Sequence, residues 1–224
     1  MRMNKGRNVV ILLLFLLLGF FLVFYSLVIF EPFKKRTEQV LVNQPNSATL
    51  GTPTISFIDP KRGNVRGTIT LVEFGDYQCR YCGEMEKTIN DALIAHPNLV
   101  LVWKDLPNVS LHHESQNAAN AARCAGRQGK FWEYHDALFK NQESLNATLY
   151  PQLAEQLGLS TGKFLSCMQN KEEDPLILRN VDEAIALGID ATPYFFLGSL
   201  RLSGQLTPAD LTAALKAAEA QTAL

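Results

Sequence analysis

The stretch Leu71-Val-Glu-Phe-Gly-Asp-Tyr-Gln-Cys-Arg-Tyr-Cys82 carries the strongest structural signal in this chain of 224 residues. Residues 68–74 are mostly β-branched or apolar, which predicts a buried strand. Residues 80–95 have apolar side chains at the spacing of an amphipathic helix, and residues 99–103 predict a second strand. Together these segments predict a β-α-β unit with a pair of cysteines at the strand-to-helix turn.

Cys79 and Cys82 have the spacing of a thiol–disulfide exchange pair. At the start of a helix, the first sulfur faces unpaired N–H groups and the positive end of the helix dipole, which favour its thiolate. The second sulfur can attack a mixed disulfide formed on the first. The same spacing is also half of a zinc site. The histidines and the other two cysteines do not supply two further ligands at matched spacing, so we expect no metal.

The rest of the chain has helical patterns and then returns to strands. Residues 115–187 are helical in pattern, residues 194–197 and 200–202 predict two strands, and a last helix begins at Thr207. Pro193 stands at the entrance of the first of these strands, where a proline cannot pair in the ladder and a cis peptide would explain its place. The predicted order is β-α-β, a helical block, and β-β-α.

An uncharged run over residues 9–30 holds 22 residues, of which 20 are apolar. A helix needs about 20 apolar residues to cross a hydrocarbon core, whereas a cleavable signal has a shorter apolar stretch that ends in small residues. We therefore predict a tail over 1–8, a transmembrane anchor over 9–30, a tether over 31–50, and one domain over 51–224 with a helical insertion at about 112–187. Three basic residues stand on each side of the anchor, so charge does not decide its orientation.

Composition excludes two further classes of protein. The net charge is -1 and the basic residues are scattered, so the chain lacks the basic stripe that nucleic-acid binding requires. No second long apolar run exists in the sequence, which excludes a multi-pass channel. Nucleic acid is therefore not expected as a partner.

Three segments together resemble the DsbA-like family of thioredoxin-fold thiol:disulfide oxidoreductases. They are residues 71–82, residues 121–139 and Thr192-Pro193, and the likeness covers about residues 51–222. The resemblance implies the α/β class, with a thioredoxin-like fold that has an inserted helical domain, here preceded by a single N-terminal transmembrane helix. It also implies a redox-active disulfide between the paired cysteines, a cis peptide before the proline, and a place of action outside the bacterial cytoplasm.

The resemblance also implies roles for particular residues. Cys79 would be the attacking cysteine and Cys82 the resolving one, and Thr192 with Pro193 would line the groove in which the extended backbone of a substrate pairs. Glu73 matches the acidic position of the family under the active site. A carboxyl there could relay the proton of the resolving cysteine as general base and then acid. The alternative for this glutamate is a strand carboxylate whose hydrogen bonds are satisfied.

The chain departs from the usual family pattern between its two cysteines. The family more often has proline after the first cysteine and histidine or tyrosine before the second. This chain has Arg80 after the first cysteine and Tyr81 before the second, so the departure is at Arg80. A fixed cation at Arg80 is expected to favour the Cys79 thiolate and so to make the disulfide more oxidising. Cys124 and Cys167 lie in apolar helical segments. They are either two small buried core residues or, in an oxidising compartment, a structural disulfide.

The resemblance thus leads to a functional expectation with alternatives. We expect a single-pass enzyme of the bacterial plasma (inner) membrane, with a cytoplasmic tail and a catalytic domain on the periplasmic or extracellular side. It would introduce disulfides into exported proteins that have reduced cysteines, without a cofactor, and a quinone-linked membrane protein would reoxidise it. The alternatives are a disulfide reductase or isomerase of the same fold, and a membrane-tethered peptide-binding chaperone whose cysteines are structural.

Overall fold

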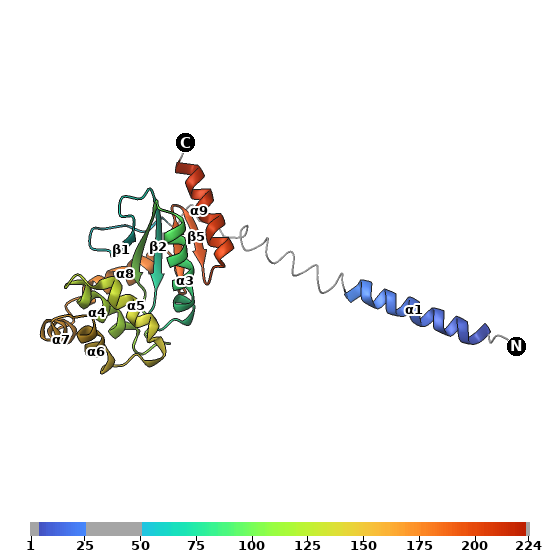
Figure 1. Ribbon diagram of the computed structural model, residues 1–224, viewed down its shortest axis with the longest axis horizontal. Coiled ribbons are helices and arrows are strands. Elements are labelled where there is room, and N and C mark those ends of the chain that lie inside the picture. The colour runs from blue at the N-terminus through green and yellow to red at the C-terminus, as the bar shows by residue number, and fades with distance from the viewer. Residues whose placement is uncertain (1–4, 26–50, 223–224) are drawn as a thin grey trace. The chain divides into compact units, whose positions relative to one another are not determined.

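The computed structural model describes residues 5–25 and 51–222, with side chains over 14–25 and 51–220. The chain divides into two units, residues 1–47 and 48–224, and each is considered by itself. In Figure 1 the colour runs along the chain from blue at the N-terminus to red at the C-terminus.

Helix α1 of the first unit runs over Lys5–Tyr25. Within the described residues, no helix combines the length and the apolar character that crossing a membrane requires. The end of the predicted anchor, residues 26–30, and the predicted tether over 31–50 lie outside the described part of the chain. The membrane anchor therefore stays a prediction.

The second unit is built on a five-stranded sheet in the order β1-β3-β2-β4-β5 (Figure 1). The strands are β1 (Lys61–Gly63), β2 (Ile69–Gly75), β3 (Leu99–Asp105), β4 (Tyr194–Leu197) and β5 (Leu200–Ser203). Strands β2 and β3 are parallel and are joined by α3 (Arg80–Ala95), whereas the other neighbours pair antiparallel. The β-α-β unit and the later strand pair are present. Strand β1 was not predicted, because three residues of which two are charged carry no strand pattern.

The helical block lies between β3 and β4 in the chain. It consists of α4 (Ser115–Gly126), α5 (Phe131–Lys140), the 3-10 turn η3 (Gln142–Ser144), α6 (Leu149–Gln156), α7 (Thr161–Gln169) and α8 (Asp174–Ala186). A last helix, α9 (Pro208–Thr222), follows β5. Figure 1 shows α4 to α7 gathered into one group beside the sheet. The thioredoxin-like fold with an inserted helical domain is therefore observed.

The side chains of β2 alternate between the two faces of the sheet. Ile69 and Leu71 belong to a buried cluster that contains residues of α3 and α9. Val72 and Phe74 belong to a cluster on the other face, with residues near the end of α8. Glu73 lies two residues after Leu71, so its side chain points to the face that α3 covers. The predicted position of this carboxyl under the start of α3 follows from this alternation.

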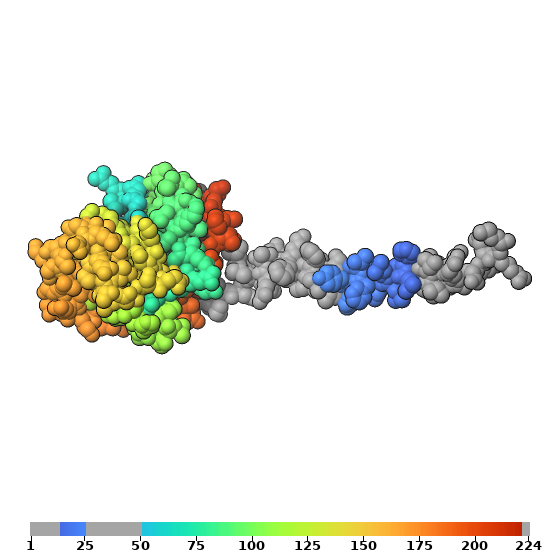
Figure 2. Space-filling view, turned by 60° about the horizontal axis from the view of Figure 1, so that its bottom comes forward, coloured from blue at the N-terminus to red at the C-terminus, as the bar shows by residue number. Residues whose placement is uncertain are grey.

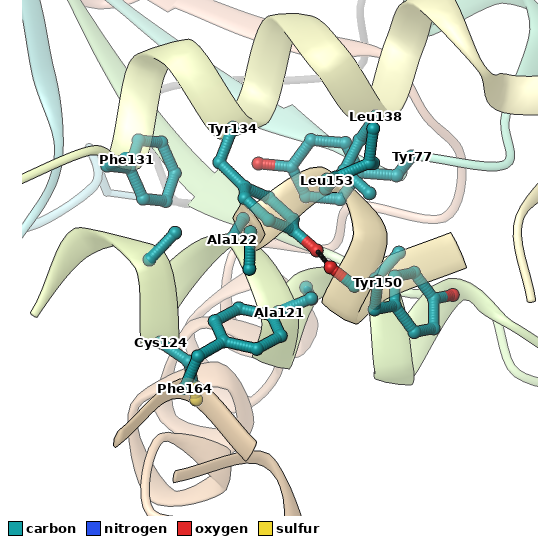
Figure 3. Close-up of a cluster of buried hydrophobic side chains, with 14 of the residues drawn as sticks. Tyr77, Ala121, Ala122, Cys124, Phe131, Tyr134, Leu138, Tyr150, Leu153 and Phe164 are labelled. Atoms are coloured by element: carbon teal, nitrogen blue, oxygen red, sulfur yellow. Dashed lines mark hydrogen bonds between the residues drawn. The ribbon is translucent and has the colours of Figure 1, made fainter. Parts of the chain in front are cut away.

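A separate core holds the helical block together (Figure 3). Tyr134 of α5 lies at its centre, where its hydroxyl donates to the carbonyl of Tyr150 at 2.8 Å. Tyr77, which follows β2, and Trp103 of β3 belong to the same buried cluster. The block is therefore packed onto the sheet through aromatic rings and does not form an independent domain.

A disulfide joins two helices of this block. Cys124 in α4 and Cys167 in α7 are bonded, with their Cα atoms 5.8 Å apart. Of the two alternatives that the sequence left for this pair, the structure has the disulfide. Because both cysteines are buried, the bridge lies inside the block and away from solvent.

Replacing Cys124 and Cys167 together by Ala is expected to lower the free energy of unfolding by roughly 4 kcal/mol. The bridge spans a sequence separation of 43 residues, and its removal frees that loop in the unfolded chain. Urea unfolding would measure the loss in a background with Cys79→Ser and Cys82→Ser, so that only this disulfide differs. An unchanged free energy would contradict the stabilising role.

Candidate active site

Residues 76–79 connect β2 to α3, and we call them the active-site turn. The N–H of Cys79 donates to the carbonyl of Asp76 at 3.0 Å, and Cys79 is the N-cap residue of α3. The residue before the turn has to be glycine, because a Cβ on Gly75 would lie 2.3 Å from the ring of Trp103. The close approach of β2 to this ring therefore sets where the chain leaves the sheet and where the helix begins.

The two thiols of the pair have contrasting environments. Both cysteines are free, Cys79 retains 6% of its exposure, and Cys82 retains none. The pKa of Cys79 is lowered to about 6, mainly by a hydrogen bond from the Cys82 thiol. Hydrogen bonds from Thr192 and from backbone N–H groups lower it further, whereas burial raises it. Burial raises the pKa of Cys82 well above its usual value, and the neighbouring Cys79 and Glu73 add to this rise. The first thiol is therefore suited to be a thiolate and the second to stay protonated.

The fold brings the predicted substrate-binding residues to the first sulfur. The peptide between Thr192 and Pro193 is cis, and Cys79 Sγ donates to the carbonyl of Thr192 at 3.3 Å. The carbonyl of Pro193 accepts from the N–H of Gly204 at 2.8 Å, which fixes the proline loop to the end of β5. Residues more than one hundred positions apart in the chain thus meet at the sulfur.

Glu73 lies buried on the face of the sheet that α3 covers. Neither of its carboxyl oxygens has a hydrogen-bond partner among the described residues, so the alternative of a satisfied strand carboxylate does not hold. Burial raises the pKa of Glu73 well above its usual value, and nearby Glu86 and Cys79 raise it further. A carboxyl of this kind can hold a proton and exchange it with Cys82, whose pKa it influences.

The two residues between the cysteines point outward. The Arg80 side chain is 79% exposed and forms an i,i+4 ion pair with Glu84, and Tyr81 is 55% exposed. The pKa of Cys79 is lowered mainly by a hydrogen bond from the Cys82 thiol, and the backbone N–H of Tyr81 adds a smaller contribution. Water and its own acidic partner screen the guanidinium. The Cys82 thiol, Thr192 and the N–H groups at the helix start therefore lower the pKa of Cys79, the effect that the sequence assigned to Arg80.

The active-site turn is also bound by side-chain contacts that the sequence did not indicate. Asp76 Oδ2 accepts from the N–H of Asn108 and lies next to Nδ1 of His112, both at 2.8 Å. Gln78 Oε1 accepts from the N–H of Glu114 at 2.6 Å. These partners lie more than thirty residues further along the chain, and no local pattern relates them to the turn.

Tyr77 and Gln142 bind the same turn from the helical block. The Tyr77 hydroxyl lies 3.0 Å from Nδ1 of His135 on α5, and its ring lies against Trp103 and Phe139 (Figure 3 shows Tyr77 at the block's core). Gln142 of η3 donates to two carbonyls of the turn. The turn is therefore held by the loop between β3 and α4 and by the helical block.

One group among the described residues has the composition of a metal site, namely Glu86, His135 and Asp136. Arg62 forms two hydrogen bonds to Asp136, and the two ring nitrogens of His135 lie next to Tyr77 and Glu86. Because each of these groups has a protein partner, we interpret the cluster as structural.

Comparison with known proteins agrees with this geometry. A family model described as thioredoxin (Thioredoxin_4) matches residues 58–217. A thioredoxin-like oxidoreductase from Silicibacter pomeroyi DSS-3 is 30% identical, with a TM-score of 0.65 over 73% of this chain and 94% of that one. The thiol-disulfide exchange protein α-DsbA2 from Wolbachia pipientis is 18% identical and shares the fold, with a TM-score of 0.66 over 72% of this chain and 88% of that one.

Curated relatives are longer proteins. The Na(+)/H(+) antiporter NhaA 1 of Salinispora arenicola (strain CNS-205) is 36% identical over 171 residues, which cover 75% of this chain and 26% of that protein. The Na(+)/H(+) antiporter NhaA of Herminiimonas arsenicoxydans is 32% identical over 171 residues, 74% of this chain and 27% of that protein. The chain spans about a quarter of the length of the curated relatives that it matches.

The substitution Glu73→Gln is expected to raise the free energy of unfolding at neutral and alkaline pH but not at acidic pH. Burial raises the pKa of Glu73 above its unfolded value, near 4.5, so folding takes up a proton. The stability of the parent should fall with rising pH between the unfolded and folded pKa values, by about 1.4 kcal/mol per pH unit. Urea unfolding from pH 4 upward would measure the difference, and equal pH slopes in both proteins would contradict it.

Proposed function

We propose that this protein introduces disulfides into exported proteins. The chain belongs to the thioredoxin family and is a DsbA-like thiol–disulfide oxidoreductase. The chemistry runs through Cys79 and Cys82, without a bound cofactor. The enzyme is anchored in the bacterial plasma membrane by residues 9–30 and acts on the periplasmic or extracellular side.

The contrast between the two thiols supports this proposal most directly. The pKa of Cys79 is lowered to about 6, and its sulfur lies beside the cis peptide at Thr192. The pKa of Cys82 is raised by burial, next to the Glu73 carboxyl, for which the described part of the chain offers no hydrogen-bond partner. Thiol–disulfide exchange needs such a division between a reactive sulfur and a buried partner.

The reaction starts from the oxidised pair. A substrate thiolate attacks Cys79 Sγ, the bond between Cys79 and Cys82 breaks, and a mixed disulfide forms. Cys82 leaves as a thiolate and takes a proton from Glu73. A second substrate thiolate then attacks the substrate sulfur of the mixed disulfide, and Cys79 leaves as a stable thiolate. Two electrons pass from the substrate to the pair, and the substrate gains a disulfide.

The stability of the reduced form supports the proposed direction of the reaction. Hydrogen bonds to Cys79 stabilise its thiolate, which exists only in the reduced enzyme. Stabilising the reduced state raises the reduction potential, so the disulfide becomes a better oxidant. This supports disulfide donation over disulfide reduction.

The second disulfide supports the place of action. Cys124 and Cys167 are bonded, and structural disulfides persist mainly in oxidising compartments such as the periplasm. The apolar run at 9–30 would keep the enzyme in the membrane, and a flexible tether over 31–50 would give a reach of about 25 Å.

A reoxidising partner completes the cycle. Each turnover leaves Cys79 and Cys82 reduced, so a second protein has to remove two electrons. We assign this role to an integral membrane protein that passes the electrons to a quinone, because an anchored enzyme would meet it in the same membrane.

The substitution Cys79→Ser is expected to abolish exchange, because the disulfide that a substrate thiolate attacks cannot form without Cys79. In Cys82→Ser the Cys79 thiolate should attack a substrate disulfide and release one substrate thiolate, and the mixed disulfide should accumulate because the resolving sulfur is missing. Mass spectrometry can measure both outcomes, after reaction of Cys79→Ser with a reduced, unfolded substrate protein and of Cys82→Ser with a substrate protein that contains a disulfide. Exchange that survives Cys79→Ser would contradict the mechanism, and a pair that resists mild reductants would favour a chaperone with structural cysteines.

The reduction potential of the pair is expected to be more oxidising than that of thioredoxin, because the pKa of Cys79 is lowered to about 6. Such potentials run from about -120 mV for strong periplasmic oxidants to about -270 mV for thioredoxin. Equilibration with glutathione, with mass mapping of all four cysteines, would measure the value. A potential near the thioredoxin end would contradict disulfide donation and favour the reductase.

A further inference from the structure

The side chain of Gln142 reaches from η3 into the active-site turn. Its Nε2 donates to the carbonyl oxygens of Tyr77 and Cys79, each at 2.8 Å. The carbonyl of Cys79 also accepts the N–H groups of Cys82 and Gly83, at 3.0 and 3.2 Å. A single amide of the helical block therefore uses both of its donor hydrogens on the turn that carries the reactive cysteine.

The residue after the second cysteine leaves room for this amide. A Cβ on Gly83 would lie 2.7 Å from Gln142 Oε1 and 3.4 Å from Nε2. Glycine inside a helix is less favourable than alanine, so its place in the first turn of α3 agrees with a need for this space. In Figure 2 the yellow surface of the helical block directly adjoins the green surface of α3.

The contacts of Gln142 act on the electrostatics of the sulfur. A carbonyl oxygen is the negative end of a dipole, so the oxygen of Cys79 opposes a negative charge on its own side chain. Each N–H donor directed at this oxygen reduces its negative potential. The same contacts fix the peptide planes of the turn, and the backbone N–H groups of Tyr81 and Cys82 hydrogen-bond the sulfur.

We propose that Gln142 is a positioning residue for the thiol chemistry, because its two hydrogen bonds hold the active-site turn in the shape in which Cys79 is reactive. This inference rests on the proposed function. It means that the helical block acts on the reaction through η3, although the block supplies no reacting atom.

Two independent variants test the proposal. Gln142→Met keeps a similar length and loses both donors, whereas Gly83→Ala keeps Gln142 and displaces its amide. The readout is the pH dependence of alkylation of Cys79 by iodoacetamide in the reduced protein, followed by mass spectrometry. The parent should show a midpoint at pH about 6. Each variant should raise the midpoint by about 0.5 pH units, which corresponds to about threefold less Cys79 thiolate at acidic pH. The double variant, with both Gln142→Met and Gly83→Ala, should show no further rise.

Gln128→Met is the matched control. Gln128 also bridges two segments of the helical block, since its Nε2 donates to the carbonyl of Ser160 at 3.3 Å and its Oε1 accepts from the N–H of the same residue at 2.9 Å. The same substitution there removes a bridging amide without touching the active-site turn. Its midpoint should equal that of the parent.

The outcomes separate the inference from the function on which it rests. If the parent is reactive and neither Gln142→Met nor Gly83→Ala moves the midpoint, the inference is wrong and the proposed function stands. Additive shifts, or an equal shift in Gln128→Met, would also overturn it. A parent midpoint near the ordinary thiol value of 9.0, with no exchange, would instead overturn the proposed function.

Discussion

The hydrogen bonds around the active-site turn are the constraint on which the rest of the structure depends. The turn has to leave β2 beside the ring of Trp103 and enter α3 with Cys79 as its N-cap residue. Contacts from the loop after β3 hold Asp76, and contacts from η3 hold the carbonyls of the turn. Partners on several elements bind the four residues of the active-site turn. The sulfur of Cys79 is therefore fixed at the start of α3, where N–H groups stabilise its thiolate.

The chemistry arises from two environments that lie only one helical turn apart. Cys79 is at the open end of α3 and next to Thr192, whereas Cys82 points into the core above Glu73. Strand alternation explains the second environment, because Glu73 shares its face with Leu71 beneath α3. A buried carboxyl without a partner costs stability, and such a cost is typical of groups retained for function.

The helical block contributes rigidity and contacts. Its aromatic core includes Tyr77 from the active-site turn, and the bridge between Cys124 and Cys167 joins two of its helices. Since the block is packed onto the sheet through Trp103 and Tyr77, a displacement of α5 or η3 would be transmitted to the reactive sulfur. The helical block therefore helps to hold the active-site turn in place, and it also stabilises the fold.

The sequence by itself determined the elements and the reactive pair, because apolar periodicity, turn residues and the spacing of Cys79 and Cys82 are local signals. The family resemblance added the roles expected of Glu73 and Pro193. Only the tertiary structure decided that Glu73 has no described partner and that Gln142 contacts the turn. Strand β1 also depended on the fold, since its three residues pair only because β3 offers an edge. Such contacts join residues that are far apart in the chain or whose side-chain directions packing sets, so no local pattern records them.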